Sequence, residues 1–160
     1  AWCGVPSGED CLPELSSSAV THGICDSCLA ELFRNWNSAE LQEFLDCLDA
    51  PVVLVNHLGK IVAGNRCAEE TFQRQIPEFK DAGLGTLIEC SATVEGVCGQ
   101  SPECSGCLVR DSVSHTVKTG HGVVGTFSRE HRTQGTRRYR LSTEKRGEAV
   151  LVRIEFSGTS

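Results

Sequence analysis

The sequence lacks any run of about 18 apolar residues, which is the length that a membrane-spanning helix requires. It also lacks the N-terminal pattern of a secretory signal peptide. No long basic block is present, and the formal net charge is −6. Because phosphate binding needs a clustered positive face, nucleic acid is a poor candidate partner. We therefore expect a cytoplasmic protein that binds neither a membrane nor nucleic acid.

Methionine is absent too, and we interpret Ala1 as either a processed start or the cut edge of a longer protein. Hydrophobic residues make up 39% of the chain, which is enough for a packed core. The length fits one domain of roughly 100 residues with a small accessory unit. The one locally basic stretch, 129–146, is interpreted as the solvent face of a hairpin, since charge runs are usually solvated.

Ten cysteines are the outlying feature of the composition. In a secreted chain, an even number of cysteines suggests a disulfide framework. Here the expected core is large enough to need no cross-links, and the cysteines form two close-spaced groups. In a reducing compartment such clustering indicates metal ligation. Cys47 and Cys67 lie between the two groups, and we interpret them as small buried hydrophobic residues.

Composition divides the chain into three regions. Residues 1–28 are rich in Gly, Pro, Ser and Cys, and a structural metal would stabilise so short a segment. Residues 29–49 carry helical apolar stripes, which predict an amphipathic helix, single or interrupted. Asn37 and Glu40 fit an N-cap and its capping-box partner. Residues 50–157 form the third region.

The third region begins and ends with strand patterns. Two short β-branched runs on either side of a Gly turn, 51–56 and 60–65, predict a hairpin, and Asn65 can cap the helix that follows. A Gly/Cys-rich loop over about 83–106 leads to a predicted helix over 108–119. Three further strands are expected over 123–128, 138–143 and 149–156. This order predicts an α+β fold, with one antiparallel sheet and helices on one face.

That order of elements resembles the PAS fold. The stretch from Leu45 to Asn65 is similar to the usual entry of a PAS domain, in which a helix, a strand, a Gly turn and a second strand lead to Asn-x-x-Ala, here Asn65 to Ala68. The resemblance covers about residues 45–156. PAS domains are typically sensory or dimerisation modules of histidine kinases, cyclases and transcription regulators. The resemblance thus implies a homodimeric sensory module whose partner is an effector such as a histidine kinase or response regulator.

Two cysteine motifs carry further resemblances. A subset of bacterial PAS domains has cysteines in the loop before the last helix, and the segments around Cys90, Cys98 and Cys104 are similar to it. The N-terminal segment is similar to a zinc-ribbon-like unit of bacterial two-component proteins, which usually runs Cys-x-x-Cys, a spacer, then His-Gly-x-Cys-x-x-Cys. The first cysteine of the opening pair would fall just before Ala1.

The loop cysteines have the spacing of a four-thiolate metal site. A Cys-x-x-Cys pair lets two thiolates converge on one ion, and two further cysteines complete a tetrahedron. The predicted ligands are Cys90, Cys98, Cys104 and Cys107. Both zinc and an iron–sulfur cluster accept four cysteines, so the ligand type does not separate them. A cluster would report oxygen or redox state, whereas zinc would hold the loop shut.

A second metal site is predicted in the N-terminal segment. Cys25 and Cys28 form its pair, with Cys3 as a third ligand. The fourth is His22, Cys11 or a residue upstream of the sequence. We expect zinc here, because a structural zinc contributes most to a short segment without a core.

Two functions follow from these patterns. The first is a sensory module whose metal centre reports redox, gas or metal state to an effector. The alternative is a zinc-stabilised dimerisation or protein-interaction module with no sensing chemistry. A redox enzyme is the weaker third reading, because the Cys-x-x-Cys pair lacks the thioredoxin-like context of a preceding strand. No nucleophile–base pair or paired carboxylates are evident, and we do not expect an enzyme.

Overall fold

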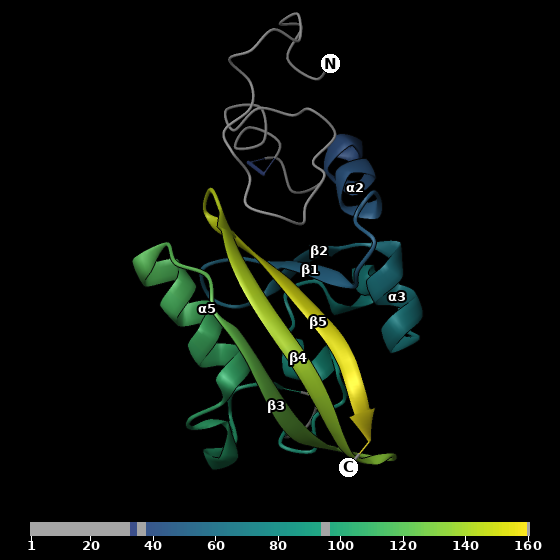
Figure 1. The fold of residues 1–160 in the computed structure, drawn as a ribbon, viewed down its shortest axis with the longest axis vertical. Coiled ribbons are helices and arrows are strands. Elements are labelled where there is room, and N and C mark those ends of the chain that lie inside the picture. The colour runs from purple at the N-terminus through teal and green to yellow at the C-terminus, as the bar shows by residue number, and fades with distance from the viewer. Residues whose placement is uncertain (1–32, 35–37, 94–96, 160) are drawn as a thin grey trace, which may run out of the picture.

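The fold is a five-stranded antiparallel sheet with helices packed against it (Figure 1). The computed structural model describes residues 33–34, 38–93 and 97–159. The strand order is β2-β1-β5-β4-β3, so the first and last strands of the chain pair at the centre of the sheet. The predicted α+β architecture is therefore confirmed. No helix in these described ranges is long and apolar enough to cross a membrane.

The elements follow one another in nearly the predicted order. The helices and strands are α2 (Ala39–Asp46), β1 (Val52–Val55), β2 (Ile61–Gly64), α3 (Arg66–Phe72), α4 (Leu84–Leu87), α5 (Leu108–Thr119), β3 (Val124–His131), β4 (Gly135–Arg146) and β5 (Ala149–Thr159), with short 3-10 turns at Ile76–Phe79 and Pro102–Cys104. The hairpin of β1 and β2 and the bounds of α5 agree with the sequence patterns. Helix α5 ends at Gly120, whose φ of 78° is left-handed, as a glycine C-cap allows.

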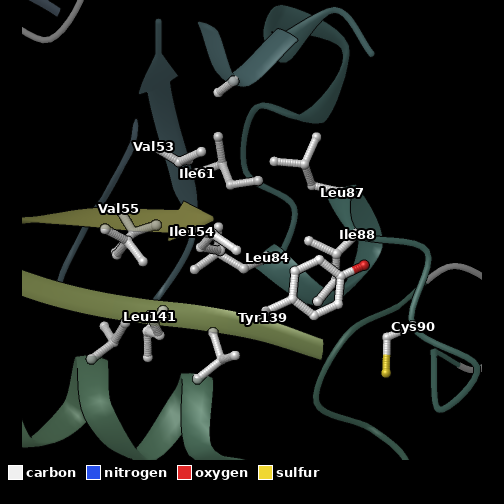
Figure 2. Close-up of a cluster of buried hydrophobic side chains, with 14 of the residues drawn as sticks. Val53, Val55, Ile61, Leu84, Leu87, Ile88, Cys90, Tyr139, Leu141 and Ile154 are labelled. Carbon is white, nitrogen blue, oxygen red and sulfur yellow. The ribbon is translucent and has the colours of Figure 1, made fainter. Parts of the chain in front are cut away.

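The main core lies between the sheet and the helices α3, α4 and α5. Figure 2 shows its centre, where Val53, Val55, Leu141 and Ile154 of the strands meet Leu84 and its neighbours around α4. The alternation of β5 places Val150, Val152 and Ile154 in this layer, as predicted. Its fourth predicted member, Phe156, lies 44% exposed near the end of the strand.

A second, smaller core lies on the opposite face of β1 and β5. Leu41 and Leu45 of α2 pack there with Phe33, Val52 and Leu54. All four residues of β1 are buried, with Val52 and Leu54 in this core and the other two in the main one. Helix α2 therefore covers the part of this face that β1 and β5 form.

The N-cap of α2 differs from the prediction. The cap is Ser38, whose hydroxyl accepts a 3.1 Å hydrogen bond from the backbone N–H of Leu41. Asn37 was the predicted cap, and it lies outside the described residues. Both residue types cap helices well, and the sequence pattern could not fix the boundary to one residue.

The basic stretch 129–146 forms the hairpin of β3 and β4, as predicted. Its cations do not all face solvent, however. Arg138 and Arg140 are exposed, whereas Arg129 and Arg137 are paired on the two strands and are half-buried. A strand directs alternate side chains to opposite faces, so a basic hairpin necessarily sends some cations inward.

Asn65 joins the entry helix, the hairpin and α3 through one fully buried side chain. Its Oδ1 accepts hydrogen bonds from the backbone N–H groups of Val52 (3.0 Å) and Ala68 (2.9 Å). Its Nδ2 donates to the carbonyls of Leu48 (3.2 Å) and Ala50 (2.8 Å). The predicted helix cap is confirmed. The same side-chain amide also hydrogen-bonds to backbone groups on both sides of Pro51.

Replacing this amide should destabilise the fold strongly. We expect Asn65→Ala to lower the free energy of unfolding by roughly 2–4 kcal/mol, because it removes a helix cap and leaves buried backbone groups unpaired. Asn56→Ala is the matched control, since Asn56 also accepts from two backbone N–H groups but lies in a half-buried turn. Urea unfolding monitored by circular dichroism measures both. An equal loss of unfolding free energy in the two variants would contradict the proposal that the burial of Asn65 makes its hydrogen bonds more important.

Candidate thiol site

The described chain holds six cysteines, none of them in a disulfide. The predicted N-terminal ligands, Cys3, Cys11, His22, Cys25 and Cys28, lie outside the described residues. Cys47 is exposed at the end of α2 and Cys67 is half-buried, so the interpretation of both as buried hydrophobic residues is wrong. The helix α2 presents its other face to the core, which leaves Cys47 in solvent.

The four loop cysteines are positioned by different elements. Cys90 follows α4 and pairs as an isolated bridge with His131 at the end of β3. Cys104 ends the 3-10 turn at Pro102–Cys104, and Cys107 is the N-cap residue of α5. Cys90 and Cys104 are buried, whereas Cys98 and Cys107 are half-buried.

All four of these cysteines line one cavity of about 450 Å³, here called the thiol pocket. Its walls come from the β1–β2 turn, α4, the cysteine-bearing loop, α5 and β3. Figure 2 shows Cys90 at the margin of the main core, of which it is a buried member. The sequence prediction that the loop cysteines gather is thus supported at the level of a shared cavity.

Glycines of the loop make room for Cys98. A Cβ atom at Gly85 would lie 2.7 Å from the Cys98 sulfur, and one at Gly83 would lie 2.6 Å from the Cys98 Cβ. The backbone of Gly85 also hydrogen-bonds to the Cys98 sulfur. These two positions therefore require glycine for a close approach to the sulfur, not for an unusual backbone angle.

Cations outnumber carboxylates in the described lining of the thiol pocket. Four cationic side chains line it (Lys60, Arg110, Lys118 and Arg129) against the single carboxylate of Asp111 among its described lining residues. Arg129 makes a side-chain hydrogen bond with Cys107. Burial by itself lowers the pKa of Arg129, but this bond and the charges of three cysteine sulfurs raise it above its ordinary value. The guanidinium is therefore held in its charged form beside the thiols.

The pKa of the Cys98 thiol is raised in the thiol pocket. Burial raises the pKa of this thiol, although the Gly85 hydrogen bond lowers it. The charges of Cys104, Cys107 and Cys90 raise it further, since a second thiolate is disfavoured near the first. A cation, either Arg129 or a bound metal, would offset that repulsion.

Arg129 is the functional residue that the sequence reasoning missed. It was assigned to a solvated charge run, but its alternation with Phe127 and His131 places it on the inner side of β3. The period-2 pattern of that strand, read together with the apolar Phe127, was the available signal.

The four loop cysteines have the ligand type that a thiolate-binding metal requires, but their positions in the structure do not form a metal site. Four thiolates are the donor set that zinc and iron–sulfur clusters accept. Across the described ranges, however, no three of the His, Cys, Asp and Glu side chains are placed so that they could hold an ion together. The sulfurs share a cavity but would have to approach one another to bind.

Comparison with solved structures identifies the fold. The chain is similar to a LOV protein of Rhodobacter sphaeroides, with a TM-score of 0.55 and 11% identity over 81% of this chain and 69% of that one. It is similar to the PAS domain of the Cronobacter turicensis RpfR quorum-sensing receptor in complex with BDSF, with a TM-score of 0.51 and 17% identity over 69% and 96%. A domain of a sensory box sensor histidine kinase/response regulator from Geobacter sulfurreducens has a TM-score of 0.51 and 11% identity over 72% and 90%.

The chain therefore has the PAS fold, as the resemblance in its sequence implied. No family model matches the sequence. No curated protein matches it either. At these identities the likeness establishes the fold alone, and the function has to be argued from the site.

The fit of Cys98 against Gly85 can be tested without any ligand. We expect Gly85→Ala to lower the free energy of unfolding by roughly 1–3 kcal/mol, because the added methyl group overlaps the Cys98 sulfur. In a Cys98→Ala background the sulfur is gone, and the same change should become neutral or stabilising, since Ala is the better helix former within α4. Urea unfolding of the four proteins in this cycle measures the coupling. Equal effects in both backgrounds would show that the sulfur does not lie there.

Proposed function

We propose that this chain is a sensory module of signal transduction and that the thiol pocket is its input site. The observation that carries the proposal is the shared cavity: four cysteines from separate parts of a loop, a turn and a helix end line the same space within a PAS fold. Among the structural neighbours, one is the PAS domain of a quorum-sensing receptor and another is a domain of a sensor histidine kinase/response regulator.

We propose that Cys90, Cys98, Cys104 and Cys107 bind a metal centre, either an iron–sulfur cluster or zinc. A cluster would supply a charge that changes on oxidation, whereas zinc would supply a cross-link of fixed charge. The four sulfurs must draw together for either centre. Cys107 stands at the start of α5, so this closure would act directly on the helix that packs against β4 and β5.

The charges of the pocket support an occupant with net negative charge. A divalent ion with four thiolates keeps a charge of about −2, by the ligand count of such sites. Arg129 donates a hydrogen bond to Cys107, and the three other cations of the lining add to its field. A charge-assisted bond of this kind would orient the Cys107 sulfur and offset part of the negative charge of the bound centre.

The remaining features of the proposal concern the rest of the chain. We propose that residues 1–28 hold a structural zinc through Cys3, Cys25 and Cys28, with His22 or Cys11 as the fourth ligand. We also propose a cytoplasmic homodimer in which residues 29–49 connect the sensory domain to an effector such as a histidine kinase or a response regulator. Helix α2 supports a connecting role, because it packs on the central strands β1 and β5 through the second core.

Metal analysis of protein purified without oxygen tests the loop site. We expect the double variant Cys104→Ser/Cys107→Ser to lose the metal of the loop site while retaining that of the N-terminal segment. The matched control is Cys47→Ser/Cys67→Ser, which also removes two cysteines but leaves the thiol pocket intact. Elemental analysis and visible absorption before and after dithionite provide the readouts.

The outcomes separate the two functions. A broad visible absorption that bleaches with dithionite and disappears in Cys104→Ser/Cys107→Ser supports a redox-active centre. A colourless protein with stoichiometric zinc favours the alternative, a zinc-stabilised dimerisation or interaction module without sensing chemistry. Unchanged metal content in Cys104→Ser/Cys107→Ser would refute the loop site. Loss of all metal in the same variant would refute the division into two separate sites.

Arg129 should strengthen metal binding at the pocket. In a Cys25→Ser/Cys28→Ser background, which disables the proposed N-terminal site, we expect Arg129→Gln to weaken Co²⁺ binding about 10-fold or more, by the strength of a charge-assisted hydrogen bond. Arg140→Gln is the control, because Arg140 is an exposed arginine of β4 outside the pocket lining. The thiolate-to-Co²⁺ absorption bands follow the titration. Equal Co²⁺ affinities of the two variants would show that Arg129 does not contribute to metal binding.

A further inference from the structure

A second cavity, of about 600 Å³, lies on the other side of the segment that carries Cys90. We call it the arginine pocket. Glu89 lines it, whereas the next residue, Cys90, lines the thiol pocket, and Ile88 contributes to both. None of the four loop cysteines lines this second cavity, so its chemistry is separate from that of the thiol pocket.

Most of the charge in the arginine pocket is already paired. The carboxylate of Glu89 forms an ion pair with Arg74, and its second oxygen lies 2.9 Å from His131 Nε2. Burial, together with the charges of Arg137 and Arg74, lowers the pKa of His131 below its ordinary value. The charges of Arg74 and Glu89 offset each other within their ion pair.

Arg137 is left as the uncompensated charge. In the described chain no carboxylate pairs with it, and its buried Nε has no hydrogen-bond partner. Its guanidinium carbon lies 5.1 Å from the centroid of the Phe156 ring, and the side chain also bonds to Tyr139. The guanidinium lines the cavity, so an anion there could pair with its charge, which no carboxylate of the described chain does.

Three aromatic residues of the lining provide room for a planar apolar group. Phe72, Tyr139 and Phe156 line the cavity, and the last two rings meet edge to face with centroids 5.9 Å apart. Phe156 is 44% exposed, so part of an aromatic wall stands open to solvent. Aromatic walls with one fixed cation are typical of sites for small molecules that join an apolar ring to an acid.

We propose that the arginine pocket is a binding site for a small carboxylate with a planar apolar group. The carboxylate meets the guanidinium of Arg137, and the planar group lies among Phe72, Tyr139 and Phe156. Arginine is suited to this role because its planar fork matches a carboxylate with two parallel hydrogen bonds. The site goes beyond the proposed function, because it requires no metal and uses none of the cysteines.

Benzoate is the probe, and benzamide, its neutral isostere, is the matched control ligand. With the full chain, we expect saturable binding of benzoate by calorimetry and at least about 10-fold weaker binding of benzamide, since only the former carries the charge. Arg137→Gln should weaken benzoate binding about 10-fold or more. Arg138→Gln, the neighbouring exposed arginine, makes the same charge change on the other face of β4 and should leave the affinity unchanged.

Amide chemical shifts of the wild-type chain give an independent readout if Arg137→Gln does not fold. Benzoate should shift the amides of Gln73 and Gln134, which line the arginine pocket, and leave those of Lys60 and Gly99 in the thiol pocket unchanged. Equal binding of benzoate and benzamide would overturn the proposal. So would unchanged affinity in a folded Arg137→Gln, shifts confined to the thiol pocket, or no saturation at about 10 mM, the weak limit for a specific small ligand.

Discussion

The short segment Glu89–Ser91 is fixed against the end of β3 by its backbone. The N–H of Ser91 donates to the carbonyl of Glu130 at 2.9 Å, and the N–H of Arg132 donates to that of Glu89 at 3.3 Å. Between these bonds Cys90 bridges His131. At this anchored segment Glu89 lines one cavity and Cys90 lines the other. Both sites therefore depend on the same two backbone hydrogen bonds.

This anchoring comes with a local backbone cost. Glu89 has a φ of 50°, a left-handed conformation that is unfavourable for a side chain other than Gly or Asn. The interactions of its carboxylate with Arg74 and His131 offset that cost. The strained residue thus stands between the two proposed binding sites.

Much of the fold was predictable because local signals and packing agreed. Helix α5 has an amphipathic stripe and a glycine stop, and its bounds are as expected. Helix α4 was missed, since Gly85 lowers helix propensity and only the burial of Leu84 and Leu87 in the main core holds the turn. Strand β4 extends beyond the predicted segment on both sides, because its charged outer residues hide the strand pattern.

The candidate site was predictable in part for a related reason. Cysteine spacing indicates which residues can converge, and the four loop cysteines do share a cavity. Spacing alone carries no information about partners that come from distant strands. Alternation along β3 and β4 can place Arg129 and Arg137 on the inner side of the sheet, but the distant segments that meet them in the two pockets are set by tertiary packing that no local window contains.

Strand β1 has a mechanical consequence for the whole domain. Its four side chains are buried alternately in the two cores, so the strand is packed as tightly on one side as on the other. Close-packed interiors have low compressibility, and β1 therefore acts as a stiff spacer between α2 and the layer of α3 to α5. Displacement of one layer cannot be absorbed within the strand. It has to appear as a tilt of the other layer or as sliding along the strand direction.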